Sequence, residues 1–198
     1  MHIAKAYLVS KTPYSQSKHI DESEHPKKNK ESPDDYENRT WMHRMHVTSD
    51  GHVYIPMTSF TGCIRTAAKR LRIRIPGKGQ AEYGKYFEAG IDAAGDLVLP
   101  TLASDAPKER LFVPSDGKPG GGKRVFRNFP RIDSWEGEMT FYILDDLIPQ
   151  DVFHQVLKSA GLLVGIGRFR PENRGFYGRF SVKSFEWIED GDAAILAA

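Results

Sequence analysis

Apolar and polar residues alternate near both ends of the chain, with the two-residue period of a β-strand that buries one face. The stretch HIAKAYLVS (2–10) has this pattern, and so does FSVKSFEWIED (180–190). Between them, KRVFRNFPRI (123–132) and GEMTFYILD (137–145) predict two strands joined by a short turn. HVYIP (52–56) predicts a further short extended piece.

Two other segments repeat their apolar residues every three or four positions, which is the spacing of an amphipathic helix. In the first, Thr58 or Ser59 can cap the helix. Its expected buried face consists of Phe60, Ile64, Ala67 and Leu71, and another face has Thr61, Arg65, Lys69 and Arg72. The second helix opens at Pro149 and is expected to bury Val152, Phe153, Val156, Leu157 and Ala160.

The elements follow one another as strand, helix, strand pair, helix and strand, which is the βαββαβ plan of a ferredoxin-like or RNA-recognition-type (RRM-like) domain. We therefore predict an α+β protein with a single domain over residues 1–192, an antiparallel sheet and helices on one face. Long insertions are expected at about 11–51 and 76–122, where polar residues, glycine and proline accumulate. Residues 11–40 are expected to be an exposed, mobile loop, 76–122 an irregular insertion, and 193–198 a flexible tail.

Composition narrows the class of protein. Of the 198 residues, 39% are hydrophobic and 27% are charged, which is typical of a soluble globular protein. No apolar run approaches the ~20 residues that span a bilayer, and the N-terminus lacks the apolar stretch of a signal peptide. The single cysteine, Cys63, excludes an internal disulfide framework and a cysteine-based zinc cluster. We expect a cytoplasmic protein with no membrane partner and no cofactor.

Basic residues are clustered although the formal net charge is only +2. Such segregated clusters suggest a surface for a polyanion, and the alternative is a set of solvated side chains. The first cluster is Arg65, Lys69, Arg70, Arg72, Arg74 and Lys78, the second is Lys123, Arg124, Arg127 and Arg131, and the third is Arg168, Arg170, Arg174 and Arg179.

The third cluster lies in GIGRFRPENRGFYGRF (165–180), which has four glycines. Gly165, Gly167, Gly175 and Gly178 can let closely spaced backbone amides face a phosphate, with the four arginines supplying charge. Phe169, Phe176 and Tyr177, and also Phe126 in the second cluster, can stack on bases. The alternative is a tight glycine turn with solvated arginines.

The helix that begins near residue 58 offers a second anion-binding feature. Helix N-termini attract anions, and the hydroxyls of Thr58, Ser59 and Thr61 add donors, although ordinary capping explains part of this pattern. Together, YIPMTSFTGCIRTAAKRL (54–71) and the glycine-rich segment resemble the CRISPR-associated RAMP superfamily (repeat-associated mysterious proteins). Its members pair an "IPGSSLKGALR"-like segment with a C-terminal "GxGR…GxG" loop. The chain departs from this pattern at Met57, where the family usually has glycine.

Within that superfamily the chain is most similar to the backbone subunit of multi-subunit effector complexes. Such subunits polymerise along a guide RNA, and an inserted thumb-like hairpin kinks the RNA at intervals. The resemblance implies a non-catalytic protein that binds single-stranded RNA, with DNA as a further option, together with copies of itself and other effector subunits. The two insertions could supply the thumb-like elements. ENRTWMHRMH (37–46) also resembles uncharacterised phage-type proteins.

Two alternatives remain open from the sequence. The first is a metal-independent endoribonuclease of CRISPR repeats, in which His43 or His46 transfers a proton beside a lysine or tyrosine. The histidines are equally compatible with surface or packing roles around Trp41, and no metal site is predicted from them. The second alternative is a self-assembling protein whose arginines meet the acidic segments 21–37 and 186–192 of a neighbouring copy.

Overall fold

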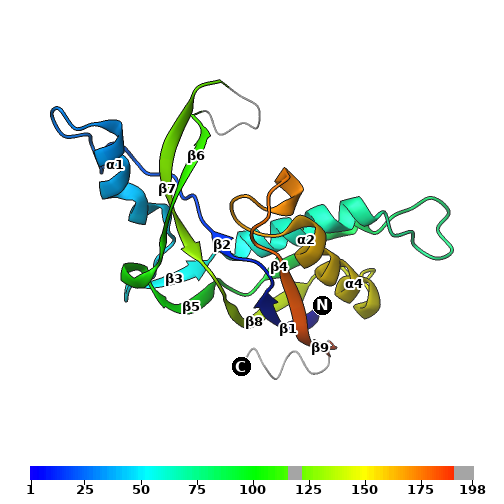
Figure 1. Cartoon of the computed structure of the whole chain (residues 1–198). Coiled ribbons are helices and arrows are strands. Elements are labelled where there is room, and N and C mark those ends of the chain that lie inside the picture. The colour runs from blue at the N-terminus through cyan, green and yellow to red at the C-terminus, as the bar shows by residue number, and fades with distance from the viewer. Residues whose placement is uncertain (116–121, 190–198) are drawn as a thin grey trace.

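The computed structural model of the chain describes residues 1–115 and 122–189. Its main sheet has four antiparallel strands in the order β4-β8-β1-β9 (Figure 1). The central strand β1 (His2–Ser10) pairs with β8 (Glu136–Ile143) on one side and with β9 (Phe180–Ile188) on the other. In this register, Ala4 lies opposite both Phe141 and Trp187. The predicted first and last strands are confirmed.

Two helices, α2 (Met57–Leu71) and α4 (Gln150–Ser159), bury their apolar faces against this sheet. A π-helix, Ala160–Val164, extends α4. Both amphipathic predictions are confirmed, since the buried side chains include Phe60, Ile64, Ala67, Val152, Phe153, Val156, Leu157 and Ala160. Among the described residues, no helix is both long and apolar enough to cross a membrane.

The predicted cap of α2 is wrong. The N-cap residue is Pro56, two residues before Thr58, and its side chain makes no capping hydrogen bond. Instead, the amide of Met57 donates a hydrogen bond of 2.8 Å to the carboxylate of Asp96, which comes from a distant segment. The helix start is therefore stabilised by a tertiary contact that the local sequence does not contain.

Both strands predicted at 123–132 and 137–145 are present, but they do not pair with each other. Strand β7 (Arg124–Ile132) pairs with β6 (Lys108–Pro114) and with the short β2 (Tyr14–Ser15), and these three form a separate sheet. The β6–β7 hairpin projects away from the main sheet (Figure 1). The position beside β8 is taken by β4 (Ile91–Ala93), which lies inside the predicted irregular insertion.

The 76–122 segment is consequently more regular than predicted. Besides β4 and β6 it contains α3 (Gly84–Ala89), β5 (Leu97–Leu102) and a 3-10 turn, Ala103–Asp105. Strand β5 pairs with β3 (His52–Ile55). The glycine-rich tip 116–121 and the predicted flexible tail 193–198 lie outside the described residues.

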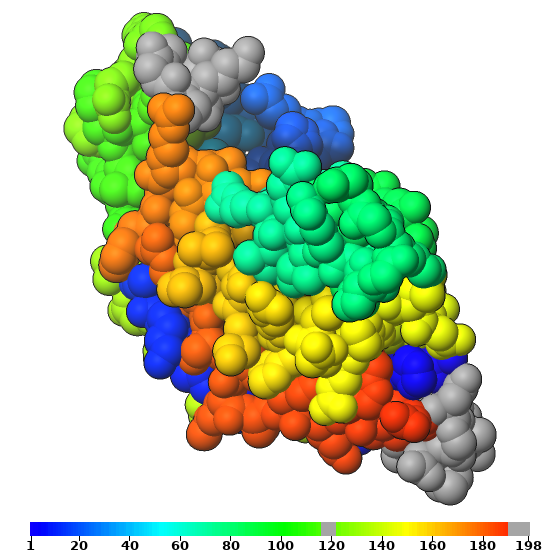
Figure 2. Space-filling view, turned by 90° about the vertical axis from the view of Figure 1, so that its right-hand side faces the viewer, coloured from blue at the N-terminus to red at the C-terminus, as the bar shows by residue number. Residues whose placement is uncertain are grey.

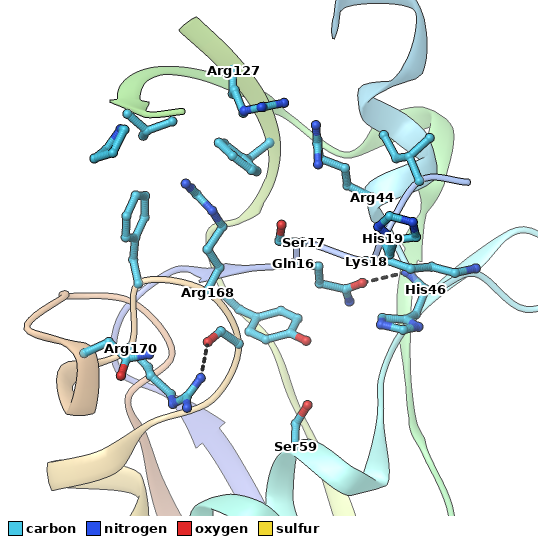
Figure 3. A pocket seen from close by; sticks show the side chains of 18 of the residues that line it. Gln16, Ser17, Lys18, His19, Arg44, His46, Ser59, Arg127, Arg168 and Arg170 are labelled. Carbon is cyan, nitrogen blue, oxygen red and sulfur yellow. Dashed lines mark hydrogen bonds between the residues drawn. The ribbon is translucent and has the colours of Figure 1, made fainter. Parts of the chain in front are cut away.

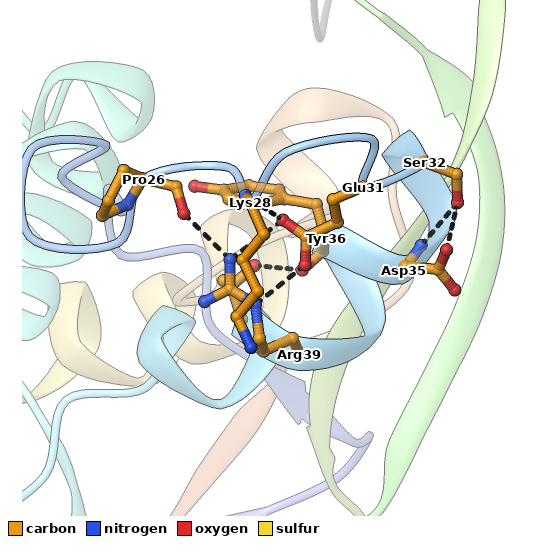
Figure 4. A network of polar contacts seen from close by, with 8 residues as sticks. Pro26, Lys28, Glu31, Ser32, Asp35, Tyr36 and Arg39 are labelled. Atoms are coloured by element: carbon orange, nitrogen blue, oxygen red, sulfur yellow. Dashed lines mark hydrogen bonds and ion pairs between the residues drawn. The ribbon is translucent and has the colours of Figure 1, made fainter.

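Residues 11–40 were expected to be an exposed loop, but they contain β2 and the helix α1 (Pro33–Thr40), followed by a 3-10 helix, Trp41–Arg44. The Ser32 hydroxyl accepts a 3.1 Å hydrogen bond from the amide of Asp35 and so caps α1 (Figure 4). The side chain of Arg39 donates a hydrogen bond of 2.9 Å to the carboxylate of Glu31 in the preceding loop, and this hydrogen bond lowers the pKa of Glu31 to about 2. Tyr36 is buried, so α1 is a packed part of the fold.

Candidate nucleic-acid interface

The glycine-rich loop is folded back on itself. The amide of Ile166 donates to the carbonyl of Gly178 at 3.0 Å, and the amide of Tyr177 donates to the carbonyl of Phe169 at 3.0 Å. Gly165, Gly167 and Gly178 have φ values of 73°, 72° and 74°, a conformation that glycine adopts without steric cost. A Cβ at Gly175 would collide with the Phe169 carbonyl, so this glycine allows the two halves of the loop to touch.

The loop also packs directly on the chain around β2. The amide of Arg168 donates to the carbonyl of Ser15 at 2.9 Å, and the amide of Gly178 donates to the carbonyl of Pro13 at 2.7 Å. A Cβ at Gly167 would collide with the Tyr14 ring. These loop amides are satisfied within the protein and are not free to face a phosphate, contrary to our expectation. Any anion that binds here must contact the side chains.

Those side chains face a cleft of about 1290 Å³, which we call the basic cleft. Four parts of the chain that are far apart in the sequence meet there. They are the glycine-rich loop, the segment that follows β2, the β6–β7 hairpin, and α1 with the 3-10 helix after it. The start of α2 contributes Pro56 and Ser59 (Figure 3). In the space-filling view the loop, in orange, lies between the green hairpin and the helices (Figure 2). The predicted loop and helix start therefore do share one cleft.

Arg168 occupies the centre of the basic cleft between two aromatic rings. Its guanidinium carbon lies 3.1 Å from the centroid of the Phe129 ring and 3.7 Å from that of Phe169. Burial, together with the positive charge of Arg44, lowers the pKa of Arg168 to about 9. Within the described residues its guanidinium group makes no hydrogen bond, and its Nη1 is buried without a partner. The aromatic sandwich fixes the plane of this cation while leaving it without an anion.

Two more arginines are held close by through one carboxylate. Glu37, which is 6% exposed, accepts hydrogen bonds from Arg44 at 3.0 Å and from Arg127 at 2.6 Å. The guanidinium of Arg44 also lies 5.3 Å from the Phe129 ring centroid. Arg44, Arg127 and Arg168 form what we call the arginine cluster. Its three guanidinium groups contact one carboxylate, that of Glu37, among the described residues, so the formal charge of the cluster with Glu37 is positive.

The rim of the basic cleft is also basic. Arg170 is paired with Glu172 at 2.7 Å and donates to the carbonyl of Gly167 at 3.3 Å. Lys18 and Arg174 are exposed, and their side chains have no partner in the part of the chain that the structure describes. Free cations at the rim are available to a polyanion.

The remaining predicted loop residues support the loop and do not line the cleft. Arg179 donates to the carbonyls of Leu162 at 3.1 Å and Phe176 at 3.4 Å. The Tyr177 hydroxyl donates to Glu109 on β6 at 2.7 Å, and burial raises the pKa of this phenol. Phe176 is 60% exposed on the outside of the loop.

The basic residues of α2 lie elsewhere. Arg65 donates to the carbonyl of Ile91 on β4 at 2.9 Å. Lys69 is paired with Glu88 of α3 at 2.6 Å, and Arg72 is paired with Glu82 at 3.0 Å. None of the three lines the basic cleft, and neither does Thr58. The structure therefore separates these predicted residues from the loop arginines.

The β6–β7 hairpin has a face of aromatic and basic side chains. Phe112 and Phe126 are each about half exposed, and their ring centroids are 5.0 Å apart. Arg110 lies over Phe126 at 4.4 Å and Arg124 over Phe112 at 5.3 Å. Lys123 is exposed at the described end of β7. Three predicted residues, Lys123, Arg124 and Phe126, thus belong to the hairpin, beside the cleft that Arg127 lines.

The two candidate histidines are separated in the same way. His46 lines the basic cleft, and its ring packs on Tyr54 with centroids 5.4 Å apart. Burial, and then the charge of Lys18, lowers the pKa of His46. His43 stacks instead on His25 with centroids 3.7 Å apart, and burial lowers its pKa. In residues 1–115 and 122–189, no group of three or more His, Cys, Asp or Glu side chains could hold a metal ion.

Sequence reasoning missed Lys18, Glu37 and Arg44 as cleft residues because they lie in the segment interpreted as an insertion, 11–51. One signal was present: SPDDYEN (32–38) has a capping serine, proline at the first helical position and acids in the first turn. That signal was sufficient to predict a helix over 33–40. It was not sufficient to predict that this helix packs against β7.

No protein-family model matches the sequence, and comparison with curated proteins gives no match. Among solved structures, a chain of the type III-B Cmr-beta bound to cognate target RNA matches with a TM-score of 0.51 and 12% identity over 95% of this chain. The match covers 61% of that chain, so the present protein spans less than two thirds of its length. Cmr6 from Pyrococcus furiosus matches with a TM-score of 0.44 and 13% identity, over 92% of this chain and 99% of that one. The chain therefore shares its fold with that Cmr-beta chain.

Proposed function

We propose that this chain binds single-stranded RNA through the sugar–phosphate backbone, without cleaving it, as a subunit of a CRISPR-type effector complex. The observation that supports this most directly is the basic cleft, where Arg127, Arg168 and Arg174 come from two distant segments of the chain. Guanidinium groups bind phosphate oxygens through paired hydrogen bonds and read no sequence by doing so. The cleft therefore favours a ligand that is recognised by its phosphates.

The arrangement of the main sheet supports the same interpretation. We infer that β1, α2, β4, β8, α4 and β9 correspond to the βαββαβ plan, and the observed strand order β4-β8-β1-β9 is compatible with a ferredoxin-like domain. We infer that the rest of the chain consists of insertions into this plan. The β6–β7 hairpin, with Phe112 and Phe126 on its exposed face, is our candidate for the thumb-like element, since both rings could stack on bases.

The test is the salt dependence of RNA binding. If the cleft and its rim neutralise about four phosphates of a single strand, log K should fall with log salt with a slope near −3. Affinity for single strands of different sequence but equal length should agree within about threefold, because backbone contacts carry no sequence information. A flat response to salt would contradict the proposal.

Assembly along the RNA is a separate part of the proposal. Nucleic acid recovered with the purified protein should show a ladder of discrete lengths if copies of the chain bind at a fixed footprint. The mass of the protein with and without RNA then distinguishes RNA-templated assembly from self-assembly. A DNA strand of the same sequence, added in competition, measures the preference for RNA.

A metal-independent endoribonuclease is the second candidate, and the position of His46 favours it. His46 lines the cleft beside Tyr54, and its lowered pKa keeps the imidazole neutral at pH 7, the form that accepts a proton. Labelled repeat RNA incubated with the protein in EDTA tests this candidate. Cleavage that disappears in His46→Ala but persists in His43→Ala would establish it and overturn the binding-only proposal.

A further inference from the structure

The arginine cluster has more positive charge than one internal phosphate of an RNA strand can balance. Arg44 and Arg127 share the carboxylate of Glu37. Within the described residues Arg168 forms no ion pair or hydrogen bond with a carboxylate, although the more distant charge of Glu109 acts on it. A phosphodiester has a single negative charge, whereas a phosphate monoester has a charge of about −1.5 to −2 at pH 7. Since charges in a partly buried site need compensation, the cluster is matched to the monoester.

The walls of the cleft favour the same ligand. Phe129, Tyr14 and Gln16, which form the wall beside Arg168, are each at most 3% exposed. An internal phosphodiester needs room for the chain to leave on both sides, whereas a terminal phosphate is attached on one side only. From the cluster, a strand can leave toward the rim, where Lys18 and Arg174 are exposed and unpaired among the described residues.

The donors are already held in position. Arg168 is clamped between Phe129 and Phe169, and Arg44 and Arg127 are fixed by Glu37. Figure 3 shows Arg44, Arg127 and Arg168 extending from three different elements into the same part of the pocket. A charged fork that is fixed before binding loses little conformational freedom when it takes up an oxyanion.

We propose that the arginine cluster binds a terminal phosphate monoester, so that the protein recognises a phosphorylated end of its RNA. The inference rests on the proposed RNA-binding function and assigns an end of the strand to this cluster. Glu37 is a positioning residue in this site. Its carboxylate accepts hydrogen bonds from two of the three guanidinium groups and so fixes them, but it does not itself bind the phosphate.

Three RNAs of one sequence and length test this inference: one with a 5′-phosphate, one with a 3′-phosphate and one with hydroxyls at both ends. One of the phosphorylated strands should bind at least about tenfold more tightly than the hydroxyl strand, as expected for added charge-assisted hydrogen bonds. The matching nucleoside monophosphate should compete for the site, and the corresponding nucleoside should not. Binding is measured by anisotropy with the full chain.

Variants place the effect in the cluster. Arg168→Gln should remove the preference for the phosphorylated end. Arg127→Gln removes another guanidinium of the cluster and serves as the second test if Arg168→Gln fails to fold. Lys69→Gln, whose side chain pairs with Glu88 away from the cleft, should keep the preference. Loss of the preference in Lys69→Gln as well would overturn the assignment to the cluster.

The outcomes separate this inference from the proposed function. Equal affinity for the three RNAs overturns the inference and leaves the proposed function standing. Competition by the nucleoside monophosphate without binding of any RNA supports the monoester site and overturns RNA binding. If neither RNA nor nucleoside monophosphate binds, both proposals are wrong.

Discussion

Two groups of basic residues look alike in the sequence and differ in the folded protein. Arg65, Lys69 and Arg72 repeat along one helix, and Arg168, Arg170 and Arg174 repeat along one loop. The helix group is matched to acceptors and carboxylates of the α3–β4 region. In the loop group, Arg170 is paired with Glu172, whereas Arg168 and Arg174 have no ionic partner among the described residues.

Clustering of charge is therefore a poor guide to function unless the partners of the charged side chains are known. In the helix group, Lys69 is neutralised by Glu88 of α3. This partner could not be foreseen, because α3 lies in the segment interpreted as irregular. The loop group joins Arg44 and Arg127, which come from two other segments. Of the two groups, only the loop group brings arginines into the cleft. The following variants test this contrast.

The largest effect is expected from Glu37→Gln. The side chain of Glu37 is 7% exposed and that of its partner Arg44 is 12% exposed, so the substitution leaves the buried guanidinium of Arg44 without an anion. Removing one partner of a buried ion pair costs about 3 kcal/mol of the free energy of unfolding. Denaturant titration followed by circular dichroism measures this loss.

Glu88→Gln is the matched control for Glu37→Gln. The pair that it breaks, Lys69–Glu88, has side chains 61% and 53% exposed, and exposed pairs contribute little to stability. The control should unfold at the same denaturant concentration as the unchanged protein. If both variants were equally destabilised, the contrast between buried and exposed ion pairs would be wrong.

The next largest effect is expected for RNA affinity in the double variant Arg127→Gln with Arg168→Gln. Each guanidinium removed takes away charge-assisted hydrogen bonds to phosphate, so affinity for single-stranded RNA should fall about 100-fold. The slope of log K against log salt should become shallower by about 1.4, because two phosphate contacts are lost. Anisotropy titrations at several salt concentrations measure both quantities. An unchanged salt slope would show that these arginines do not contact phosphates.

The sequence predicted the helices and strands that have a clear local pattern of apolar residues. The first and last strands and the apolar faces of both main helices follow from periodicity over nine or more residues. Strand β4 escaped notice because three residues, Ile91–Ala93, are too few to show any period. Strand β7 was found, but its partner was wrong, since pairing depends on which edge is free in the folded sheet.

The residues of the site also differ in whether local sequence reveals them. The two segments that the sequence analysis singled out, the glycine-rich loop and the start of α2, meet at one cleft, which Ser59, Gly167 and Arg168 line. Glu37 and Arg44 could not be found in this way, because their roles depend on how α1 packs against β7. That packing uses polar contacts, such as the 3.0 Å hydrogen bond from Asn128 to Asn38, which leave no apolar signature in the sequence.

The smallest effect is expected for the double variant Lys69→Gln with Arg72→Gln, which removes the same formal charge as the cleft variant. Both side chains are paired with carboxylates on the α3 side, so their removal uncovers Glu82 and Glu88 and leaves the cleft intact. RNA affinity should change less than about twofold at physiological salt, where exposed charges farther than ~8 Å from the ligand are largely screened. Equal losses in the two double variants would mean that the protein binds RNA through its overall charge, and the basic cleft would then have no special role.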